Sequence, residues 1–474
     1  MDLEGPITPE ITLDTLRSLE DHLGLAPTEG QAKGLYILSR MLDSQMERCA
    51  FLLKGYAGTG KTSMMKALVG HLKSKGERFR CLAPTGRAAK VLSRYTDSPA
   101  FTIHKQIYRK LESPDGGISF GLAHSTWKDT VFIVDEASMI SEDRSLSGND
   151  LLGDLLEYVY SNSGNRLVLL GDEAQLPPVG LNRSPALDID ILRSDFGLRI
   201  ATMELTEVVR QSVDSGILDY ATQLRDGLGQ EGFTPLELAL PDGLDISYTS
   251  PYELPDVLES AYARHGVDEV KVICRSNKDA WQYNQQIRTR VLYKEDRLEA
   301  GDRVMVVRNN YLWSEGHKEL PFIANGEMME LLYLRNGEER YGLSFREAGL
   351  ELVEQESLGT LDAKVMLDSL DAQGPAMSPE AMEHLYRSVR EDLSYIHKGS
   401  KLKAEMQEDP YLNALQLKYG YAITCHKAQG GQWPVVIVDR GFVPQDADFT
   451  DFTRWLYTAV TRATEKLYII GSRD

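Results

Sequence analysis

A glycine-rich segment at residues 55–62, Gly-Tyr-Ala-Gly-Thr-Gly-Lys-Thr, constrains this chain more than any other part of its sequence. It follows an apolar run at residues 49–53 that is typical of a buried strand. A loop that wraps a phosphate chain with its own N–H groups needs glycine wherever a Cβ would collide. The segment predicts a P-loop for a nucleoside triphosphate, with Lys61 on the β- and γ-phosphates and Thr62 on Mg²⁺. The residues expected to bind the nucleotide here are Gly55, Gly58, Thr59, Gly60, Lys61 and Thr62.

Composition favours a globular chain of several domains. At 474 residues the chain is too long for one core, and it is 42% hydrophobic and 26% charged. No apolar stretch reaches the roughly 18 to 20 residues of a membrane span, and the N-terminus lacks a signal-peptide pattern. We therefore expect a cytoplasmic protein with no membrane partner. The four cysteines, Cys49, Cys81, Cys274 and Cys425, are far apart, which favours reduced core residues over zinc ligands or disulfides.

Charge is distributed unevenly along the chain. The net charge is −19, yet residues 71–110 carry ten Lys and Arg side chains against two acidic ones, a local +8. A basic segment in an acidic protein suits a polyanion such as nucleic acid, because the local field matters more than the total charge. A solvated helix face gives the same pattern, and charge alone leaves both interpretations open.

Apolar runs typical of strands occur in two sets. The first set lies at residues 50–53, 79–83, 131–134 and 167–170, and the second at 270–274, 435–438 and 467–470. Helical or loop stretches separate the runs, which indicates an α/β fold with parallel strands and crossovers. Only the first set contains a P-loop, so we expect two α/β domains that share one nucleotide site.

Three further segments have other patterns. Residues 1–25 have apolar residues at helical spacing and predict a short accessory helix. Residues 301–350 read as short strands joined by turns and predict a small β-barrel. Residues 351–410 carry thirteen acidic side chains against six basic ones. We expect this acidic insertion to be helical and solvent-facing, and to be the place where any protein partner binds.

Two adjacent carboxylates, Asp135 and Glu136, close the apolar run at 131–134. Asp135 can hold Mg²⁺ through water or together with Thr62, and Glu136 can orient and deprotonate the water that attacks the γ-phosphate. A lone Asp-Glu pair is usually a turn or surface feature. Its position after a strand and downstream of a P-loop favours the catalytic interpretation.

Three more polar residues are candidates for contact with the γ-phosphate. Gln175 stands in the loop at residues 171–180, and its amide can donate to a phosphate oxygen and accept from the attacking water. Arg210 and Arg462 can bring positive charge, which accelerates phosphoryl transfer roughly 10³- to 10⁵-fold where it has been tested. The structural alternatives are a polar loop stiffened by prolines and two surface ion pairs.

Taken together, these segments resemble superfamily 1B DNA helicases of the RecD and Dda type over about residues 26–474. The match is weakest in the acidic insertion. The resemblance implies ATP as the nucleotide, with Gln31 reading adenine and with Gln429 and Gly430 added to the nucleotide-binding residues. The family motifs occur in order at residues 27–31 (Q), 55–62 (I), 83–89 (Ia), 102–104 (Ib), 135–136 (II), 175–178 (III), around Arg210 (IV), 422–430 (V) and around Arg462 (VI).

The resemblance also implies a domain organisation. It predicts two RecA-like P-loop domains, with a β-hairpin inserted in the first and an SH3-like β-barrel plus the acidic insertion in the second. The expected boundaries are 1–25 for the accessory helix, 26–105 and 129–200 for the first RecA-like domain, 106–128 for the hairpin, 201–300 and 413–474 for the second RecA-like domain, and 301–412 for the barrel with its insertion.

In this family single-stranded DNA lies across both RecA-like domains and is held chiefly through its phosphates. A satisfied buried imidazole is the alternative role for His104 and for His426. The hairpin would act as a pin that splits the duplex at a junction, where Phe120 stacks on the terminal base pair or serves as a core contact of the hairpin itself. The residues implied in DNA binding are Pro84, Thr85, Arg87, Lys90, Thr102, His104, Phe120, Thr424, His426 and Lys427.

The resulting hypothesis is an ATP-dependent DNA helicase. It would move 5′ to 3′ on single-stranded DNA and unwind duplex in DNA repair, recombination or replication. One alternative is an RNA-directed or purely translocating ATPase, because the same motifs bind phosphates of both nucleic acids. The other is a nucleotide-gated binding subunit that uses ATP to switch its contacts with partners.

Overall fold

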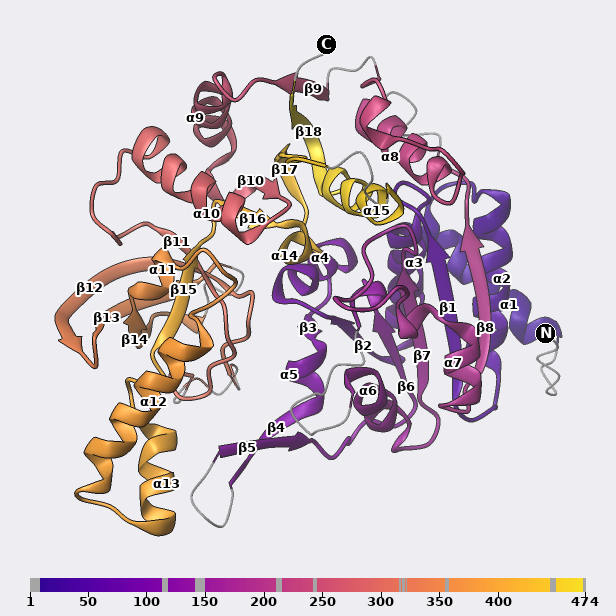
Figure 1. The fold of residues 1–474 in the computed structure, drawn as a ribbon. Coiled ribbons are helices and arrows are strands. Elements are labelled where there is room, and N and C mark those ends of the chain that lie inside the picture. The colour runs from indigo at the N-terminus through magenta and orange to yellow at the C-terminus, as the bar shows by residue number, and fades with distance from the viewer. Residues whose placement is uncertain are drawn as a thin grey trace.

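The computed structural model describes residues 9–112, 118–140, 150–209, 215–241, 245–314, 317, 320, 322–353, 358–443 and 449–471. Figure 1 shows two parallel sheets with their helices, a closed β-barrel and a helical extension from the barrel. Within the residues described, no helix is both long and apolar enough to cross a bilayer. All four cysteines are buried and free, as the sequence predicts.

The first sheet has six parallel strands in the order β3-β2-β6-β7-β1-β8. Its strand β1 (Cys49–Gly55) is almost entirely buried, as expected of a parallel sheet covered on both faces. Successive side chains point to opposite faces, so Phe51 packs in one core cluster and Leu52 in the other. The other strands are β2 (Arg78–Ala83), β3 (Ala100–Thr102), β6 (Thr130–Val134), β7 (Arg166–Gly171) and β8 (Arg199–Leu205).

Helices cover both faces of this sheet. The Phe51 face packs against α1, α2, α3 and α4, and the Leu52 face against α5, α6 and α7. The helices are α1 (Pro9–Leu23), α2 (Glu29–Asp43), α3 (Lys61–Lys75), α4 (Gly86–Thr96), α5 (Ile103–Ile107), α6 (Leu151–Tyr160) and α7 (Ile189–Ser194), with short 3₁₀ turns η1 (Ala137–Met139) and η2 (Pro185–Leu187).

Two expectations about the first domain are corrected. The helix α1 is not an accessory segment, because Leu19 is fully buried in the same core cluster as Phe51. The boundary at residue 200 falls inside β8, whose residues 199–205 pair in parallel with β1. The first sheet therefore extends to Leu205, and apolar residues at both ends of the expected domain complete its core.

The second sheet has five parallel strands in the order β16-β10-β17-β18-β9. The helix α15 (Phe449–Val460) packs against α8 (Gly216–Gly227) and faces the first domain (Figure 1). The strands are β9 (Ile246–Thr249), β10 (Val270–Cys274), β16 (Ala422–Thr424), β17 (Trp433–Val438) and β18 (Ala463–Ile470). The remaining helices are α9 (Leu254–His265), α10 (Asn277–Gln286) and α14 (Cys425–Ala428), with the turns η4 (Pro235–Glu237), η5 (Val267–Glu269) and the π-helix η6 (Ile287–Val291).

The barrel is larger than the sequence predicts. It consists of β11 (Arg303–Val306), β12 (Met328–Arg340), β13 (Leu343–Leu352), β14 (Leu361–Met366) and β15 (Leu415–Tyr419). The strand β15 closes it by pairing antiparallel with β11 and parallel with β14. The expected barrel limit at 350 therefore leaves out β14 and β15, and the expected domain limit at 412 leaves out β15.

The acidic insertion is only partly helical, since β14 lies within it. Between β14 and β15 the chain forms α11 (Asp368–Asp371), α12 (Pro379–Ser394) and α13 (Gly399–Glu408). The helices α12 and α13 project from the barrel at the lower left of Figure 1. Their inner side packs on the barrel through Leu385 and Val389, which are fully buried.

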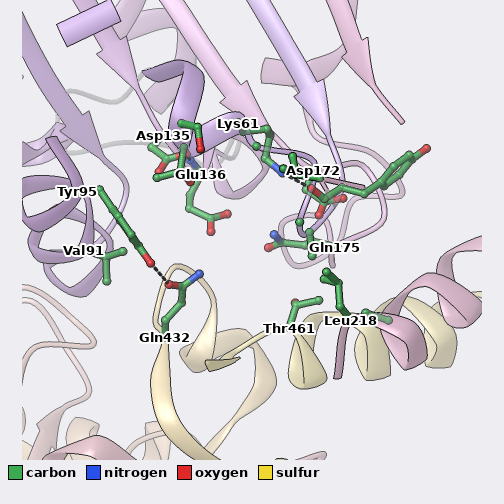
Figure 2. A pocket seen from close by; sticks show the side chains of 18 of the residues that line it. Lys61, Val91, Tyr95, Asp135, Glu136, Asp172, Gln175, Leu218, Gln432 and Thr461 are labelled. Carbon is green, nitrogen blue, oxygen red and sulfur yellow. Dashed lines mark hydrogen bonds between the residues drawn. The ribbon is translucent and has the colours of Figure 1, made fainter. Parts of the chain in front are cut away.

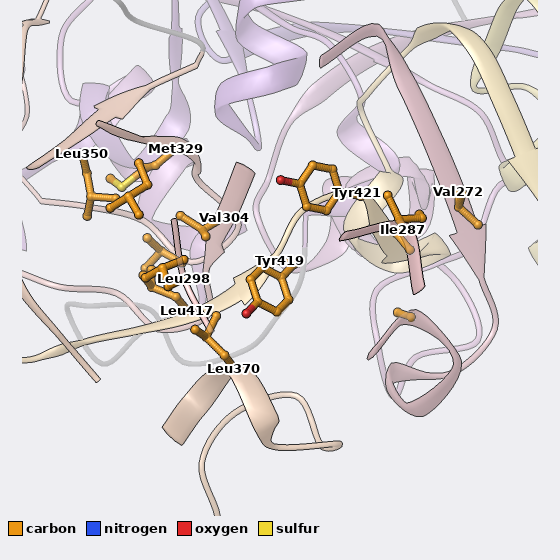
Figure 3. Packing of buried hydrophobic residues seen from close by; sticks show 14 of the residues in the cluster. Val272, Ile287, Leu298, Val304, Met329, Leu350, Leu370, Leu417, Tyr419 and Tyr421 are labelled. Carbon is orange, nitrogen blue, oxygen red and sulfur yellow. The ribbon is translucent and has the colours of Figure 1, made fainter. Parts of the chain in front are cut away.

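One apolar core joins the barrel to the second sheet (Figure 3). Tyr421, between β15 and β16, is fully buried and donates its hydroxyl to Asp302 Oδ1 at 2.8 Å. Asp302 Oδ2 accepts from Arg288 Nη2 at 2.9 Å, so the buried charge is paired. Because packing and hydrogen bonds are continuous across this junction, we expect the barrel to move with the second sheet.

A two-stranded antiparallel hairpin lies where the sequence predicts one. It pairs β4 (Tyr108–Glu112) with β5 (Ile118–Leu122), and Phe120 stands opposite Lys110. The backbone of Phe120 is described, whereas its side chain and the turn at 113–117 lie outside the described residues. Arg210 lies outside them as well, so its expected role stays a prediction.

Candidate functional site

The P-loop connects β1 to α3 and has the backbone that its glycines predict. Gly58 and Gly60 have φ values of +76° and +86°, in the left-handed region that favours glycine. A Cβ on Gly60 would lie 2.2 Å from Gln31 Nε2, so no other residue fits there without displacing that side chain. The ammonium of Lys61 donates to the carbonyls of Gly55 and Tyr56.

Gln31 connects the start of α2 to the P-loop. Its Oε1 accepts from the Thr28 amide at 3.1 Å, which completes a capping box with the Thr28 hydroxyl. Its Nε2 donates to the Thr59 carbonyl at 3.2 Å, and its side chain is buried. Gln31 therefore fixes the P-loop relative to α2.

A cavity of about 480 Å³ extends from the P-loop to the second domain (Figure 2). On the first domain it is lined by Gly58, Gly60, Lys61 and Thr62 together with Asp135, Glu136 and Gln175. On the second it is lined by Gly430, Gln432, Thr461 and Arg462. Its size is that of a small-molecule site, and the polar groups gather at the phosphate-binding loop.

The carboxylates Asp135 and Glu136 follow β6 at the bottom of this cavity. Burial, and next the charge of Glu136, raise the pKa of Asp135 to about 6. Glu136 has a φ of +52°, which is uncommon for a residue with a side chain. Such strain costs about 1 to 3 kcal/mol and is concentrated at functional sites. Asp135 and Thr62 line the same cavity and offer the hard oxygen ligands that Mg²⁺ prefers.

Arg462 of the second domain extends to Glu136 of the first. Its Nη1 lies 3.5 Å from Glu136 Oε1, and its guanidinium is only 3% exposed. Three further bonds hold it, from Nε to the Thr458 carbonyl at 3.0 Å, from Nη1 to the Gly431 carbonyl at 3.2 Å and from Nη2 to the Thr461 hydroxyl at 3.2 Å. The predicted arginine and the predicted base therefore meet at the domain boundary.

Gln175 lies in the same cavity, in the loop after β7. Its side chain is buried, and its Oε1 has no hydrogen-bond partner within the described part of the chain. A buried acceptor without a partner is costly, and a ligand with a donor would satisfy it. This is the geometry expected of a residue that contacts a bound nucleotide or an attacking water.

The sequence analysis missed a bridge between the domains beside Gln175. The Tyr457 hydroxyl donates to Asp172 Oδ2 at 2.7 Å and accepts from the Ala57 amide of the P-loop at 2.8 Å. Burial raises the pKa of both Asp172 and Tyr457, and the hydrogen bond between them is shielded from solvent. The available signal was that Asp172-Glu173 repeats, after β7, the Asp-Glu pattern that follows β6.

A second cavity, of about 360 Å³, lies between the first domain, the barrel and the second domain. The barrel contributes Phe322, whose ring centroid lies 6.2 Å from that of His104. Burial lowers the pKa of His104 to about 4, so its imidazole is neutral at pH 7. Of the residues expected to bind DNA, seven line this cavity: Pro84, Thr85, Arg87, Thr102, His104, His426 and Lys427.

Five of the expected site residues do not line the cavity expected for them, namely Gly55, Thr59, Lys90, Thr424 and Gln429. Lys90 donates from Nζ to the Val353 carbonyl of the barrel at 3.1 Å, and Thr424 is buried beside a small separate cavity. Thr59 is fully buried, and its hydroxyl donates to Tyr56. Gln429 lines the second cavity and donates to the Leu176 carbonyl at 2.7 Å, and its expected contact with the nucleotide stays a prediction.

Comparisons with known proteins match two parts of the chain. A family model for an AAA domain matches residues 37–238, and one for a UvrD-like helicase C-terminal domain matches residues 419–470. Between them they match more than half of the chain. They include the P-loop, the two carboxylates, the Gln175 loop and the Arg462 segment.

Two proteins that are similar to this chain are ATP-dependent DNA helicases. The chain is 30% identical over 190 residues to the ATP-dependent RecD2 DNA helicase of Deinococcus radiodurans, which is 40% of this chain and 23% of that protein. It is 29% identical over 265 residues to the ATP-dependent DNA helicase dda of Enterobacteria phage T4, which is 52% of this chain and 56% of that protein. The chain thus spans between about a quarter and just over half of the length of these relatives.

Solved structures include a Pif1 helicase from Bacteroides in complex with ADP-AlF3 and ssDNA. That structure is 17% identical to this chain and has a TM-score of 0.47. The match covers 95% of this chain and 94% of the Pif1 chain. The two family models, which together match more than half of the chain, show that it belongs to the helicases that combine an AAA domain with a UvrD-like C-terminal domain, and its named relatives are of the RecD and Dda type.

Proposed function

We propose that this protein is an ATP-dependent DNA helicase that moves 5′ to 3′ on single-stranded DNA and separates duplex at a junction. The observation that carries the proposal is the contact of Arg462 with Glu136 at 3.5 Å across the domain boundary. It makes the nucleotide cavity a shared site of both domains. The second cavity, lined by most of the expected DNA-binding residues, lies between the same two domains.

The residues of the nucleotide cavity have distinct roles in this proposal. Lys61 binds the β- and γ-phosphates, and Gln175 and Glu136 orient the attacking water, from which Glu136 takes a proton. Arg462, with Arg210, neutralises charge that develops on the γ-phosphate. Thr62 and Asp135 would hold Mg²⁺, which supplies further neutralisation of the phosphate oxygens.

Movement on DNA follows from the fact that both cavities lie between the same two domains. A bound nucleotide lies beside the Arg462–Glu136 contact and joins the two domains, and hydrolysis followed by release of phosphate removes the γ-phosphate charge that both domains contact. The groups that face the second cavity then change their separation, because they belong to different domains. Phosphate contacts dominate in such a site, which suits translocation on any sequence.

The test combines two measurements on the purified chain. ATP hydrolysis is measured without nucleic acid, with single-stranded DNA and with single-stranded RNA, and Lys61→Ala serves as the inactive control. Unwinding is measured on duplexes that carry a 5′ or a 3′ single-stranded tail. We expect stimulation by DNA and unwinding of the 5′-tailed duplex alone. Stimulation by RNA only, unwinding from the 3′ tail, or ATP hydrolysis without unwinding would each contradict the proposal.

A further inference from the structure

The backbone of one residue of the first domain, Leu176, is bonded to the second domain through both its N–H and its carbonyl. Its N–H donates to the Thr458 hydroxyl at 2.8 Å, and its carbonyl accepts from Gln429 Nε2 at 2.7 Å. Leu176, Thr458 and Gln429 are all buried. A buried backbone group without a partner is strongly unfavourable, so these two bonds tie the loop to the second domain.

Thr458 and Gln429, the two partners of the Leu176 backbone, are themselves held in place. The Thr458 hydroxyl donates its proton to the Arg454 carbonyl one turn earlier in α15, at 2.7 Å, which directs a lone pair at Leu176. Gln429 directly follows α14, the short helix that carries His426 and Lys427. These two side chains line the second cavity, so Gln429 connects the Leu176 peptide to the expected DNA site.

The residue next to Leu176 is Gln175, the expected contact of the γ-phosphate. The same loop is held at its other end, where Asp172 accepts from Tyr457, the neighbour of Thr458 on α15. The loop from 172 to 176 therefore has both ends bonded to one helix of the other domain. Any shift of the second domain relative to the first must carry this loop with it or leave buried polar groups unpaired.

We propose that Thr458 is a positioning residue that, with Gln429, holds the backbone N–H and carbonyl of Leu176 and thereby transmits nucleic-acid binding at α14 to Gln175 in the nucleotide cavity. The inference rests on the proposed function and adds the route by which DNA stimulates hydrolysis. Thr458 lines neither of the two cavities and would act only through the loop. The coupling has a physical basis, because the two peptide groups that flank the Leu176 Cα are both bonded to residues of the second domain.

The chain offers a matched control on the same helix. Thr453 is also buried on α15, and its hydroxyl also donates to the carbonyl four residues earlier, that of Phe449, at 2.5 Å. Thr458 differs in accepting the Leu176 amide as well. Replacing either threonine by valine removes one hydroxyl at nearly constant volume, and only Thr458→Val removes a bond between the domains.

The experiment measures ATP hydrolysis with and without saturating single-stranded DNA for the parent, Thr458→Val, Thr458→Ser and Thr453→Val. We expect Thr458→Val to keep basal hydrolysis and DNA affinity while its stimulation by DNA falls about five- to tenfold, within the usual range of coupling between sites. Thr458→Ser keeps the hydroxyl and should restore stimulation. Thr453→Val should behave as the parent, and melting curves should show intact folding for all three.

Three outcomes overturn the inference. Equal loss of basal and stimulated rates in Thr458→Val would make Thr458 a residue of the catalytic site or of the core. Normal stimulation in Thr458→Val would show that the Leu176 bond transmits nothing, and an equal effect of Thr453→Val would assign the loss to α15 itself. A parent protein without DNA stimulation would instead refute the proposed function, which separates the two failures.

Discussion

The Arg462 guanidinium and the Glu136 carboxylate lie 3.5 Å apart although 326 positions separate them in the chain. Each is held on its own domain, Arg462 by carbonyls of α15 and of residue 431, and Glu136 by a strained backbone with a φ of +52°. Their contact makes the nucleotide cavity sensitive to the distance between the domains. Changes at this pair should therefore affect turnover more than nucleotide affinity.

Glu136→Gln should abolish turnover and leave ATP binding intact. The amide keeps the size of the side chain and cannot take a proton from water, so the rate should fall roughly 10²- to 10⁴-fold. The measurement compares steady-state ATP hydrolysis with binding of a fluorescent ATP analogue. Glu173→Gln, the second residue of the Asp-Glu pair after β7, is the matched control and should keep the parent rate. A normal rate in Glu136→Gln would mean that another group activates the water.

Asp135→Asn should raise the melting temperature in the absence of Mg²⁺. Burial, and then Glu136, raise the pKa of Asp135 to about 6, above the roughly 3.9 of an unfolded aspartate. Folding therefore favours the protonated acid, and the destabilisation by ionised Asp135 grows between about pH 4 and pH 6 and is complete above pH 6. The increase in melting temperature of Asp135→Asn over the parent should accordingly be largest at pH 7.5 and become smaller toward pH 4.5.

Melting curves at several pH values, with Mg²⁺ omitted and then added, test this expectation. Asp226→Asn, which changes a largely exposed carboxylate paired with Arg225, serves as a surface control and should alter the melting temperature little. Added Mg²⁺ should stabilise the parent and not the asparagine variant, since the ligand is lost. A lower melting temperature for Asp135→Asn at pH 7.5 would show that the ionised carboxylate is compensated inside the protein.

Lys427→Ala should weaken DNA binding and make it less dependent on salt. Lys427 lines the second cavity, and each phosphate contact that is lost should reduce the slope of log affinity against log salt by about 0.7 for a single strand. Anisotropy titrations of a labelled oligonucleotide at several salt concentrations measure the slope. Lys33→Ala, on α2 and ion-paired with Glu29, should leave it unchanged. An unchanged slope for Lys427→Ala would move the DNA path out of this cavity.

Local patterns in the sequence were sufficient to predict the phosphate-binding loop and the two carboxylates. Their function depends on neighbouring residues in the chain, so spacing alone carries the information. The direction of the Gln429 side chain was not predictable in this way, because its partner is the Leu176 carbonyl of another domain. The closure of the barrel by β15 was missed for a similar reason. That strand is far in sequence from β11, and its burial resembles that of a strand of the second sheet.

The position of the DNA-binding residues was predicted in part. Motifs that begin short helices, at Thr85 and Thr102, meet in the second cavity because parallel strands deliver their carboxyl ends to one edge of a sheet. Lys90 was expected there from charge alone. It contacts the barrel instead, since one turn of helix α4 carries it past the cavity to the Val353 carbonyl. Charge predicts which segment lies near the DNA, but only the position along helix α4 determines which side chain reaches the cavity.

Phe120→Ala should impair duplex unwinding and leave DNA-stimulated ATP hydrolysis nearly unchanged. The hairpin of β4 and β5 forms its own two-stranded sheet, separate from the six-stranded sheet that carries the P-loop. An aromatic ring that stacks on a base contributes roughly 1 to 3 kcal/mol at that contact, so strand separation should slow while the motor continues. Unwinding of a 5′-tailed duplex and hydrolysis on single strands are measured in parallel, with Phe120→Trp expected to retain unwinding. If Phe120→Ala lowers both rates together, or melts at a clearly lower temperature, the ring belongs to the core of the domain and does not act at the junction.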